Sequence, residues 1–173
     1  NWATISFTTN CTSVTSFVEN FDAVTTPAFP NCWAKVGAGG TTNTQTGSAN
    51  SAPNTMYFAS FSTTSLAVVS TQQVSNLGAG TNRIKFDMRA NFTVGGVVEV
   101  GYLTDPTDAT TFVSLTTFTA SALTYSTYQY SPPAGSYSDY PAFRHTGSPG
   151  NSVLIDNVVW EANPACADQT GVV

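Results

Sequence analysis

Charged side chains are scarce in this sequence. Of its 173 residues 9% are charged, with 10 Asp and Glu, 5 Lys and Arg and 1 histidine, and the net charge is −5 at neutral pH. So few basic residues cannot build the positive surface with which proteins bind nucleic acid or anionic membranes. No apolar run approaches the roughly 20 residues that a membrane helix needs. We therefore expect no nucleic acid as a partner and no membrane insertion.

The sequence also has few of the residues that usually cover the surface of helices. Most of its polar residues are Thr, Ser, Asn and Gly, and 41% of the chain is hydrophobic. This composition is typical of strands and turns. Short β-branched and aromatic segments alternate with Gly, Pro and Asn turns about every 8 to 15 residues, which predicts about ten strands. We expect an all-β protein, a two-sheet antiparallel β-sandwich with jelly-roll topology.

A chain of this length suits one domain. We expect an irregular lead-in over residues 1–13, the sandwich domain over 14–162 and a C-terminal linker over 163–173. The first strand is predicted over 14–22. Residues 37–54 are so rich in Gly, Asn and Ser that they predict a long loop.

Residues 83–90 and 152–161 give the clearest strand patterns. The first alternates apolar and charged residues, as a half-exposed antiparallel strand does. The second is apolar at nearly every position, which predicts burial on both faces, yet it carries Asp156 in its middle. Because strand side chains alternate between faces, Asp156 is expected on the face of Leu154 and Val158. A carboxylate there must be paired, hydrogen-bonded or bound to a cation.

Six short motifs occur in an order that resembles the MAM-like jelly-roll modules of secreted Bacteroidetes proteins, which are similar to the cleaved-adhesin domains of gingipain-type proteases. They read ENFD at 19–22, FPNCW at 29–33, SAPN at 51–54, VGYLTDP at 100–106, AFRH at 142–145 and IDNV at 155–158. The resemblance implies a jelly roll used for adhesion or glycan binding within a larger secreted protein, often with a structural calcium ion. It also implies that Asp22 and Asp156 lie side by side.

Calcium takes about six to eight oxygen ligands, from carboxylates, amides, carbonyls and water. Within the resemblance, Glu19, Asp22 and Asp156 are the candidate metal residues for a structural Ca²⁺ that fastens the first strand to the last. The alternative is that these acids cap turns or accept hydrogen bonds from backbone amides. Asp105 and Asp108 form a second acidic motif, for which a capped turn is the favoured interpretation, because Asp side chains bond amides two residues on.

Three cysteines suit an extracellular protein with one disulfide and one cysteine left over. If the first and last strands pair antiparallel with Phe21 near Asp156, the same register brings Cys11 opposite Cys166, and this geometry favours a Cys11–Cys166 bond. The resemblance instead suggests Cys32 as the partner of Cys166. Both pairings stay open.

His145 is the only histidine, and no motif supplies it with a nucleophile or substrate partner, so a structural role is expected. Tyrosines cluster in one segment, at positions 125, 128, 130, 137 and 140, where they can fill the core or bind sugars and proteins. We therefore assign a catalytic role to none of the residues.

We interpret the chain as a non-catalytic, calcium-stabilised adhesion or carbohydrate-binding module of a larger secreted or cell-surface protein. Its expected partners are a glycan or extracellular protein and the neighbouring domains of the same chain, and its ligand-binding residues are unknown. The alternatives are a spacer domain without a ligand and, third, a glycan-active enzyme built on paired carboxylates.

Overall fold

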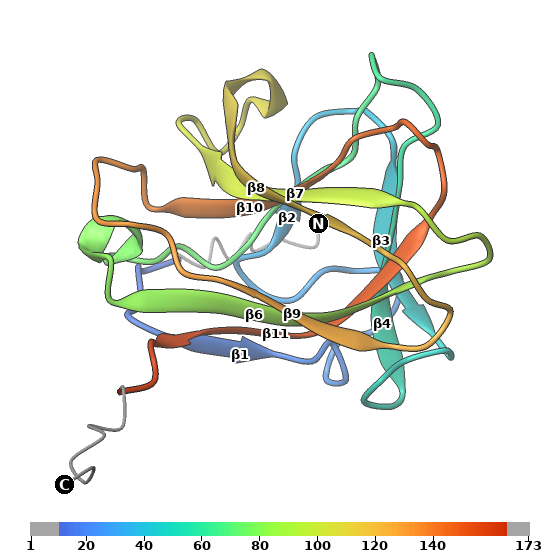
Figure 1. The fold of residues 1–173 in the computed structure, drawn as a ribbon, viewed down its shortest axis with the longest axis horizontal. Helices are drawn as coiled ribbons and strands as arrows, with labels where there is room; N and C mark the ends of the chain where they lie inside the picture. The colour runs from blue at the N-terminus through green and yellow to red at the C-terminus, as the bar shows by residue number, and fades with distance from the viewer. Residues whose placement is uncertain (1–10, 166–173) are drawn as a thin grey trace, which may run out of the picture.

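The computed structural model describes residues 11–165 and folds them into two antiparallel sheets that lie face to face (Figure 1). The strands are β1 (Phe17–Glu19), β2 (Ala34–Lys35), β3 (Thr41–Thr46), β4 (Asn54–Ala59), β5 (Val68–Ser70), β6 (Asn82–Ala90), β7 (Val97–Leu103), β8 (Phe112–Thr119), β9 (Ser126–Tyr130), β10 (Tyr140–His145) and β11 (Val153–Ala162). The predicted all-β sandwich is confirmed.

One sheet has six strands in the order β3-β4-β11-β6-β9, with β1 paired to β11 as well, and the other has five in the order β2-β5-β10-β7-β8. The helical segments of the described chain are two short 3-10 turns, η1 (Leu77–Ala79) and η2 (Ala109–Thr111). No helix among these residues is long and apolar enough to cross a membrane.

The core fills the space between the sheets, and aromatic rings contribute much of it. Phe86 packs edge-on against Phe143 and Phe118 and stacks on Tyr128 at 5.8 Å. Trp160 is also buried in this core. The alternation predicted for residues 83–90 is confirmed in β6, whose apolar residues are buried and whose charged residues are half-exposed.

The last strand, β11, is the centre of the six-stranded sheet. Strand β6 pairs along most of its length, whereas its other edge is shared by two short strands: β4 pairs with Val153–Ile155 and β1 with Val158–Trp160. The pairing of Phe17 with Trp160 confirms that the first and last strands are antiparallel neighbours. Asp156 lies where the neighbour changes from β4 to β1.

A β-bulge interrupts β11 at the same place. The register with β6 shifts between Asp156 and Val159, and Asn157 has a left-handed backbone with φ of 49°. Because the bulge adds one residue, the core face passes from Ile155 to Val158. The prediction that Asp156 shares a face with Val158 is therefore wrong, and strand alternation places Asp156 on the face of Leu154, away from the core.

Two other predictions are wrong. Residues 37–54 are not one loop, because β3 runs through them and buries Thr42 and Thr44 on one face. The first strand is also shorter than expected. The chain pairs with β11 only from Phe17 onward, and Val14 forms a bridge with Val74 instead.

Candidate functional site

Asp156 is fully buried, and its carboxylate is occupied by hydrogen-bond donors. Oδ2 accepts the backbone N–H groups of Asn50 at 2.7 Å and Ser51 at 2.9 Å, while Oδ1 accepts the N–H of Asn157 at 2.8 Å and the Ser51 hydroxyl at 3.3 Å. Burial raises the pKa of Asp156, and these backbone hydrogen bonds oppose that rise. Asp156 thus fastens the segment before β4 to the bulge of β11.

Glu19 and Asp22 lie at the end of β1. Glu19 Oε1 accepts the backbone N–H of Phe21 at 2.6 Å, and Asp22 accepts the backbone N–H of Asn54 at 3.2 Å and the Asn20 amide at 2.8 Å. Burial raises the pKa of Glu19; the hydrogen bond from Phe21 opposes this, and the negative charges of Asp22 and Asp156 add to it. The charges of Asp22 and Asp156 thus act on Glu19, and we call Glu19, Asp22 and Asp156 the acidic cluster.

The negative charge of this acidic cluster suits a cation, but its side chains do not form a complete set of metal ligands. The ion pairs among the described residues join Arg83 and Lys85 to Glu161 and Arg144 to Glu99, so no basic side chain neutralises the cluster. However, no group of three or more His, Cys, Asp or Glu side chains within residues 11–165 is arranged so that it could hold a metal ion. A calcium ion here would need amide and carbonyl oxygens besides the carboxylates, which are ligands it accepts.

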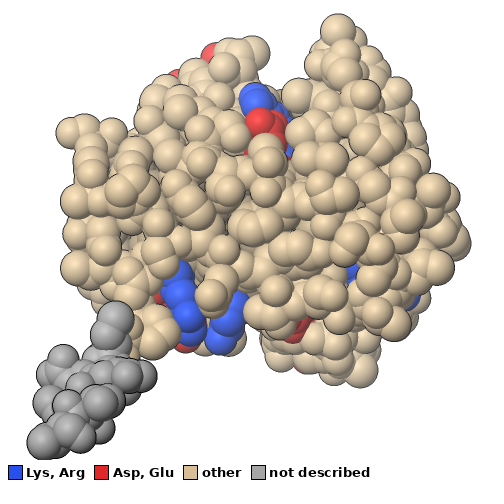
Figure 2. All heavy atoms as spheres, viewed as in Figure 1, with Lys and Arg blue, Asp and Glu red and all other residues tan. Residues whose placement is uncertain are grey.

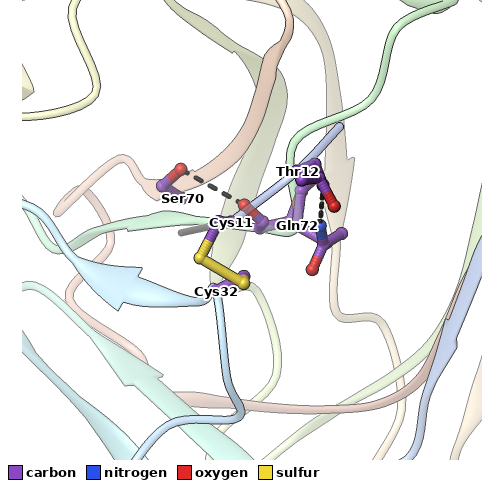
Figure 3. Close-up of a disulfide and its surroundings, with 6 residues drawn as sticks. Cys11, Thr12, Cys32, Ser70 and Gln72 are labelled. Atoms are coloured by element: carbon purple, nitrogen blue, oxygen red, sulfur yellow. Dashed lines mark hydrogen bonds between the residues drawn. A yellow bond between two sulfur atoms is a disulfide. The ribbon is translucent and has the colours of Figure 1, made fainter. Parts of the chain in front are cut away.

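The disulfide joins Cys11 to Cys32, with 5.5 Å between their Cα atoms (Figure 3). Because a sulfur forms one disulfide, the predictions of Cys11–Cys166 and Cys32–Cys166 are both wrong; Cys166 itself lies outside the described residues. The register that suggested Cys11–Cys166 ends at Phe17. Before that residue the chain runs beside residues 72–75, where the Gln72 amide donates to the Thr12 carbonyl at 2.8 Å. This path brings Cys11 to the turn before β2.

His145 is fully buried at the end of β10 and makes two hydrogen bonds within the following turn. Its Nδ1 accepts the N–H of Gly147 at 3.0 Å, and its Nε2 donates to the carbonyl of Asn151 at 2.8 Å. Burial lowers the pKa of His145, against the opposing effect of the Asn151 carbonyl. The imidazole is therefore neutral and holds the 146–151 turn, which agrees with the expected structural role.

Asp105 and Asp108 cap turns, as predicted. Asp105 Oδ1 accepts the hydroxyl of Thr107 at 2.7 Å and its N–H at 2.8 Å, and these two hydrogen bonds lower the pKa of Asp105. Asp108 Oδ1 accepts the N–H of Thr110 at 2.9 Å at the start of η2. The Thr111 hydroxyl donates to the Asp108 carbonyl at 2.8 Å. These bonds fix the loop between β7 and β8.

The tyrosines do not gather into one binding surface. Tyr128 and Tyr130 pack against the core, and Tyr140 packs on a smaller apolar cluster. Tyr125 is half-buried and donates to the Ser48 carbonyl at 2.9 Å. Of the two roles left open for these rings, filling the core agrees with the positions of Tyr128, Tyr130 and Tyr140.

A groove of about 490 Å³ lies on the side of the five-stranded sheet that faces away from the core. Loops form its walls, and its lining comprises residues 37–39, 63–66 and 107–110 together with Val68 and Arg144. Figure 2 shows a hollow between two lobes at the top of the molecule, with blue and red side chains at its base. We call this the outer groove.

The base of the outer groove carries an ion pair that the sequence analysis missed. Arg144 in β10 is the register partner of Glu99 in β7, and its Nε donates to Glu99 Oε2 at 2.6 Å. The guanidinium also lies over the ring of Phe112, 4.3 Å from its centroid. One acidic and one basic residue on two strands without any other Asp, Glu, Lys or Arg were the signal in the sequence.

Comparison with solved structures identifies this arrangement of strands. The chain is similar to the K2 cleaved adhesin domain of Lys-gingipain, with a TM-score of 0.67 and 17% identity over 86% of this chain and 98% of that one. The K1 domain of Lys-gingipain from Porphyromonas gingivalis W83 gives a TM-score of 0.66 and 20% identity over 87% of this chain and 100% of that one. The chain has the fold of a cleaved adhesin domain.

The expectation drawn from the six motifs is thus confirmed for the fold. A more distant similarity is to the CBM22-1 xylan-binding domain of Xyn10C from Paenibacillus barcinonensis, with a TM-score of 0.56 and 10% identity over 87% of this chain and 95% of that one. No family model matches the chain, and no match is found among the curated proteins.

Proposed function

We propose that this chain is a non-catalytic adhesion or carbohydrate-binding module. The observation that carries the proposal is the outer groove, whose volume lies within the range of about 300 to 1,000 Å³ typical of ligand sites. The similar structures support it, because they include adhesin domains and a xylan-binding domain with the same arrangement of sheets.

The state of the acids supports a binding role over hydrolysis. Glycoside hydrolysis needs two carboxyl groups that face the substrate, one as acid and one as base or nucleophile. Asp156 is fully buried with both oxygens accepting hydrogen bonds, and Glu99 is paired with Arg144. Asp156 thus holds backbone N–H groups and Glu99 holds the Arg144 guanidinium, so neither carboxylate is free to act on a substrate.

Calcium belongs to the proposal as a structural ion. Glu19, Asp22 and Asp156 would supply the negative charge at the junction of β1, β4 and β11, with amide and carbonyl oxygens completing the shell. The support is the uncompensated charge of the acidic cluster. In this role the ion would fasten the first strand to the last and leave the ligand surface elsewhere.

We further propose that the module works in an exported or cell-surface protein, with neighbouring domains of its own chain as partners. The Cys11–Cys32 disulfide supports export, because disulfides persist in oxidising compartments. The alternative is a spacer domain that binds no ligand of its own.

Binding assays separate these proposals. The purified domain is screened against an array of neutral and acidic glycans and against immobilised collagen, fibronectin and laminin, with 1 mM calcium throughout. Saturable binding to a glycan or matrix protein is expected. Binding to none of them would favour the spacer, whereas release of shorter sugars from a bound glycan would revive the enzyme.

A further inference from the structure

Arg144 presents a fixed set of N–H donors to the outer groove. Its Nε is bound by Glu99 at 2.6 Å, and the guanidinium lies 4.3 Å from the centroid of the buried Phe112 ring. Neither Nη group donates to another described residue, and the side chain lines the groove. Because one nitrogen is bound and one face is covered, the remaining donors are held in place before any ligand arrives.

Such a pair of donors suits two adjacent oxygen acceptors, which a carboxylate or two vicinal hydroxyls can provide. The charges around the groove decide between them. Glu99 neutralises Arg144, and Asp108, which also lines the groove, adds a negative charge to a chain of net charge −5. An anionic ligand would meet an arginine whose charge Glu99 already balances, together with the negative charge of Asp108 in the same lining.

We infer that the outer groove binds a neutral saccharide, whose vicinal hydroxyls accept from the Arg144 guanidinium and donate to Asp108. Asp108 has an acceptor to offer, because its Oδ1 takes both hydrogen bonds from Thr110 and its Oδ2 takes none from the described residues. The inference rests on the proposed carbohydrate-binding function and names its site and ligand class.

The groove lacks an aromatic platform. None of its lining residues is aromatic, and the Phe112 ring beneath is covered by Arg144. Stacking of a ring on a sugar face therefore contributes nothing, and recognition depends on hydroxyl groups at the edge of the sugar. The groove would therefore distinguish sugars by the positions of their hydroxyl groups.

The walls of the groove are preorganised. A Cβ on Gly39 would lie 2.3 Å from the Leu66 carbonyl oxygen, so two walls touch there through backbone. Lys35 Nζ donates to the Gly40 carbonyl at 2.9 Å, and Asp108 caps η2 on the opposite wall. A rigid site orders few groups on binding, which favours affinity for a small ligand.

The test measures binding of four probes by isothermal titration calorimetry: the hexasaccharides of xylose, mannose, glucose and galacturonic acid. Wild-type protein is expected to bind at least one neutral probe and to bind the galacturonate probe at least about ten-fold more weakly. Preference for the acidic probe would overturn the inference. Binding to none of the four would overturn both the inference and the glycan form of the proposed function.

Two variants test the site. Ala38→Trp fills the groove from an exposed lining position and is expected to abolish binding, whereas Ala162→Trp, at an exposed position of the other sheet, leaves it unchanged. If Ala38→Trp binds as wild type does, the site is elsewhere and the inference fails, although the proposed function stands.

Charge variants test the ligand class. Asp108→Asn keeps the η2 cap and is expected to weaken the neutral probe by about ten-fold, as loss of a charged hydrogen-bond partner does. Glu99→Gln keeps an acceptor for Arg144 and is expected to strengthen only the galacturonate probe. Glu161→Gln, which removes the partner of Arg83 on the other sheet, is the matched control. An unchanged affinity in Asp108→Asn would contradict its role.

Discussion

Ser51 contacts both carboxylate oxygens of Asp156, although 105 residues separate them in sequence. Its backbone N–H lies 2.9 Å from Oδ2 and its hydroxyl 3.3 Å from Oδ1. The contact closes the gap in the six-stranded sheet where β1 ends and β4 begins beside β11. A buried carboxylate thus replaces strand pairing at this point.

Asp156→Asn is expected to destabilise the domain by about 3 kcal/mol, equivalent to a fall in Tm of about 6 to 12 °C. The asparagine NH₂ group would face donors whichever way it turns, since N–H groups point at both oxygens of Asp156. Urea and thermal unfolding measure the loss.

The control for this variant is Asp87→Asn. Asp87 is the register partner of Asp156, but it is half-exposed and accepts from the side chains of Thr127, Asn50 and Asn157, which can turn to water. The free energy of unfolding of Asp87→Asn is expected to fall by less than about 1 kcal/mol. Equal losses in the two variants would show that the backbone donors around Asp156 carry no special weight.

Glu19→Gln tests the calcium proposal. A raised folded pKa means that the stability linked to Glu19 is present below its unfolded pKa and is lost as pH rises through the folded pKa. Without calcium at pH 7 the variant is therefore expected to be more stable than wild type, by about 2 to 4 °C in Tm. Glutamine still accepts the Phe21 N–H.

With 1 mM calcium the order is expected to reverse, because wild type gains an ion that the variant binds weakly. Glu161→Gln is the control: Glu161 is paired with Arg83, which lowers its pKa, so its loss has the opposite sign and no dependence on calcium. Equal gains from calcium in Glu19→Gln and wild type would contradict the assigned site.

The sequence predicted the sandwich, and the alternation of β6, because these follow from local patterns that burial enforces. It could not predict the bulge at Asn157, which depends on two strands sharing one edge of β11 and on donors from residues 50 and 51. The acidic cluster came from motif resemblance, and in the structure the charges of Asp22 and Asp156 act on Glu19. Arg144 and Glu99 were missed because only cross-strand register shows that they pair.

The strand β3 was missed for a similar reason. Its sequence TTNTQT has no apolar residue, so it resembles a loop, yet Thr42 and Thr44 are buried and the strand pairs with β4 from Thr41 to Thr46. These threonines are buried because β3 pairs with the apolar strand β4 at the edge of the sheet, which the composition of β3 alone does not show.

The disulfide makes a third prediction. Replacing Cys11 and Cys32 by serine is expected to cost about 3 kcal/mol, since the bond closes a loop of 21 residues. Thermal unfolding of the double variant beside wild type measures this loss. Peptide mapping without reduction should recover Cys11 linked to Cys32, and a peptide joining either one to Cys166 would show that the assignment is wrong.

His145 makes the fourth prediction, on the pH dependence of stability. Its folded pKa is lowered by burial, so the unfolded chain takes up a proton that the folded chain does not. The stability linked to His145 is present above the unfolded pKa of about 6.5 and is lost as pH falls towards the folded value. The titration of His145 is therefore expected to lower Tm between about pH 6.5 and pH 5.

His145→Gln separates this titration from the loss of packing. Glutamine has an acceptor and a donor but lacks the rigid ring that packs edge-on against Phe58, so the variant should be less stable at pH 8 by about 2 kcal/mol. The fall in its Tm between about pH 6.5 and pH 5 should nevertheless be smaller than in wild type, because His145 is the only histidine of the chain and the carboxylates titrate in both proteins alike. The slope of Tm against pH, measured by thermal unfolding across that window, reports the proton that His145 takes up when the chain unfolds. An equal slope in wild type and variant would mean that the folded protein protonates His145 as readily as the unfolded chain does, and the buried neutral imidazole would have to be abandoned.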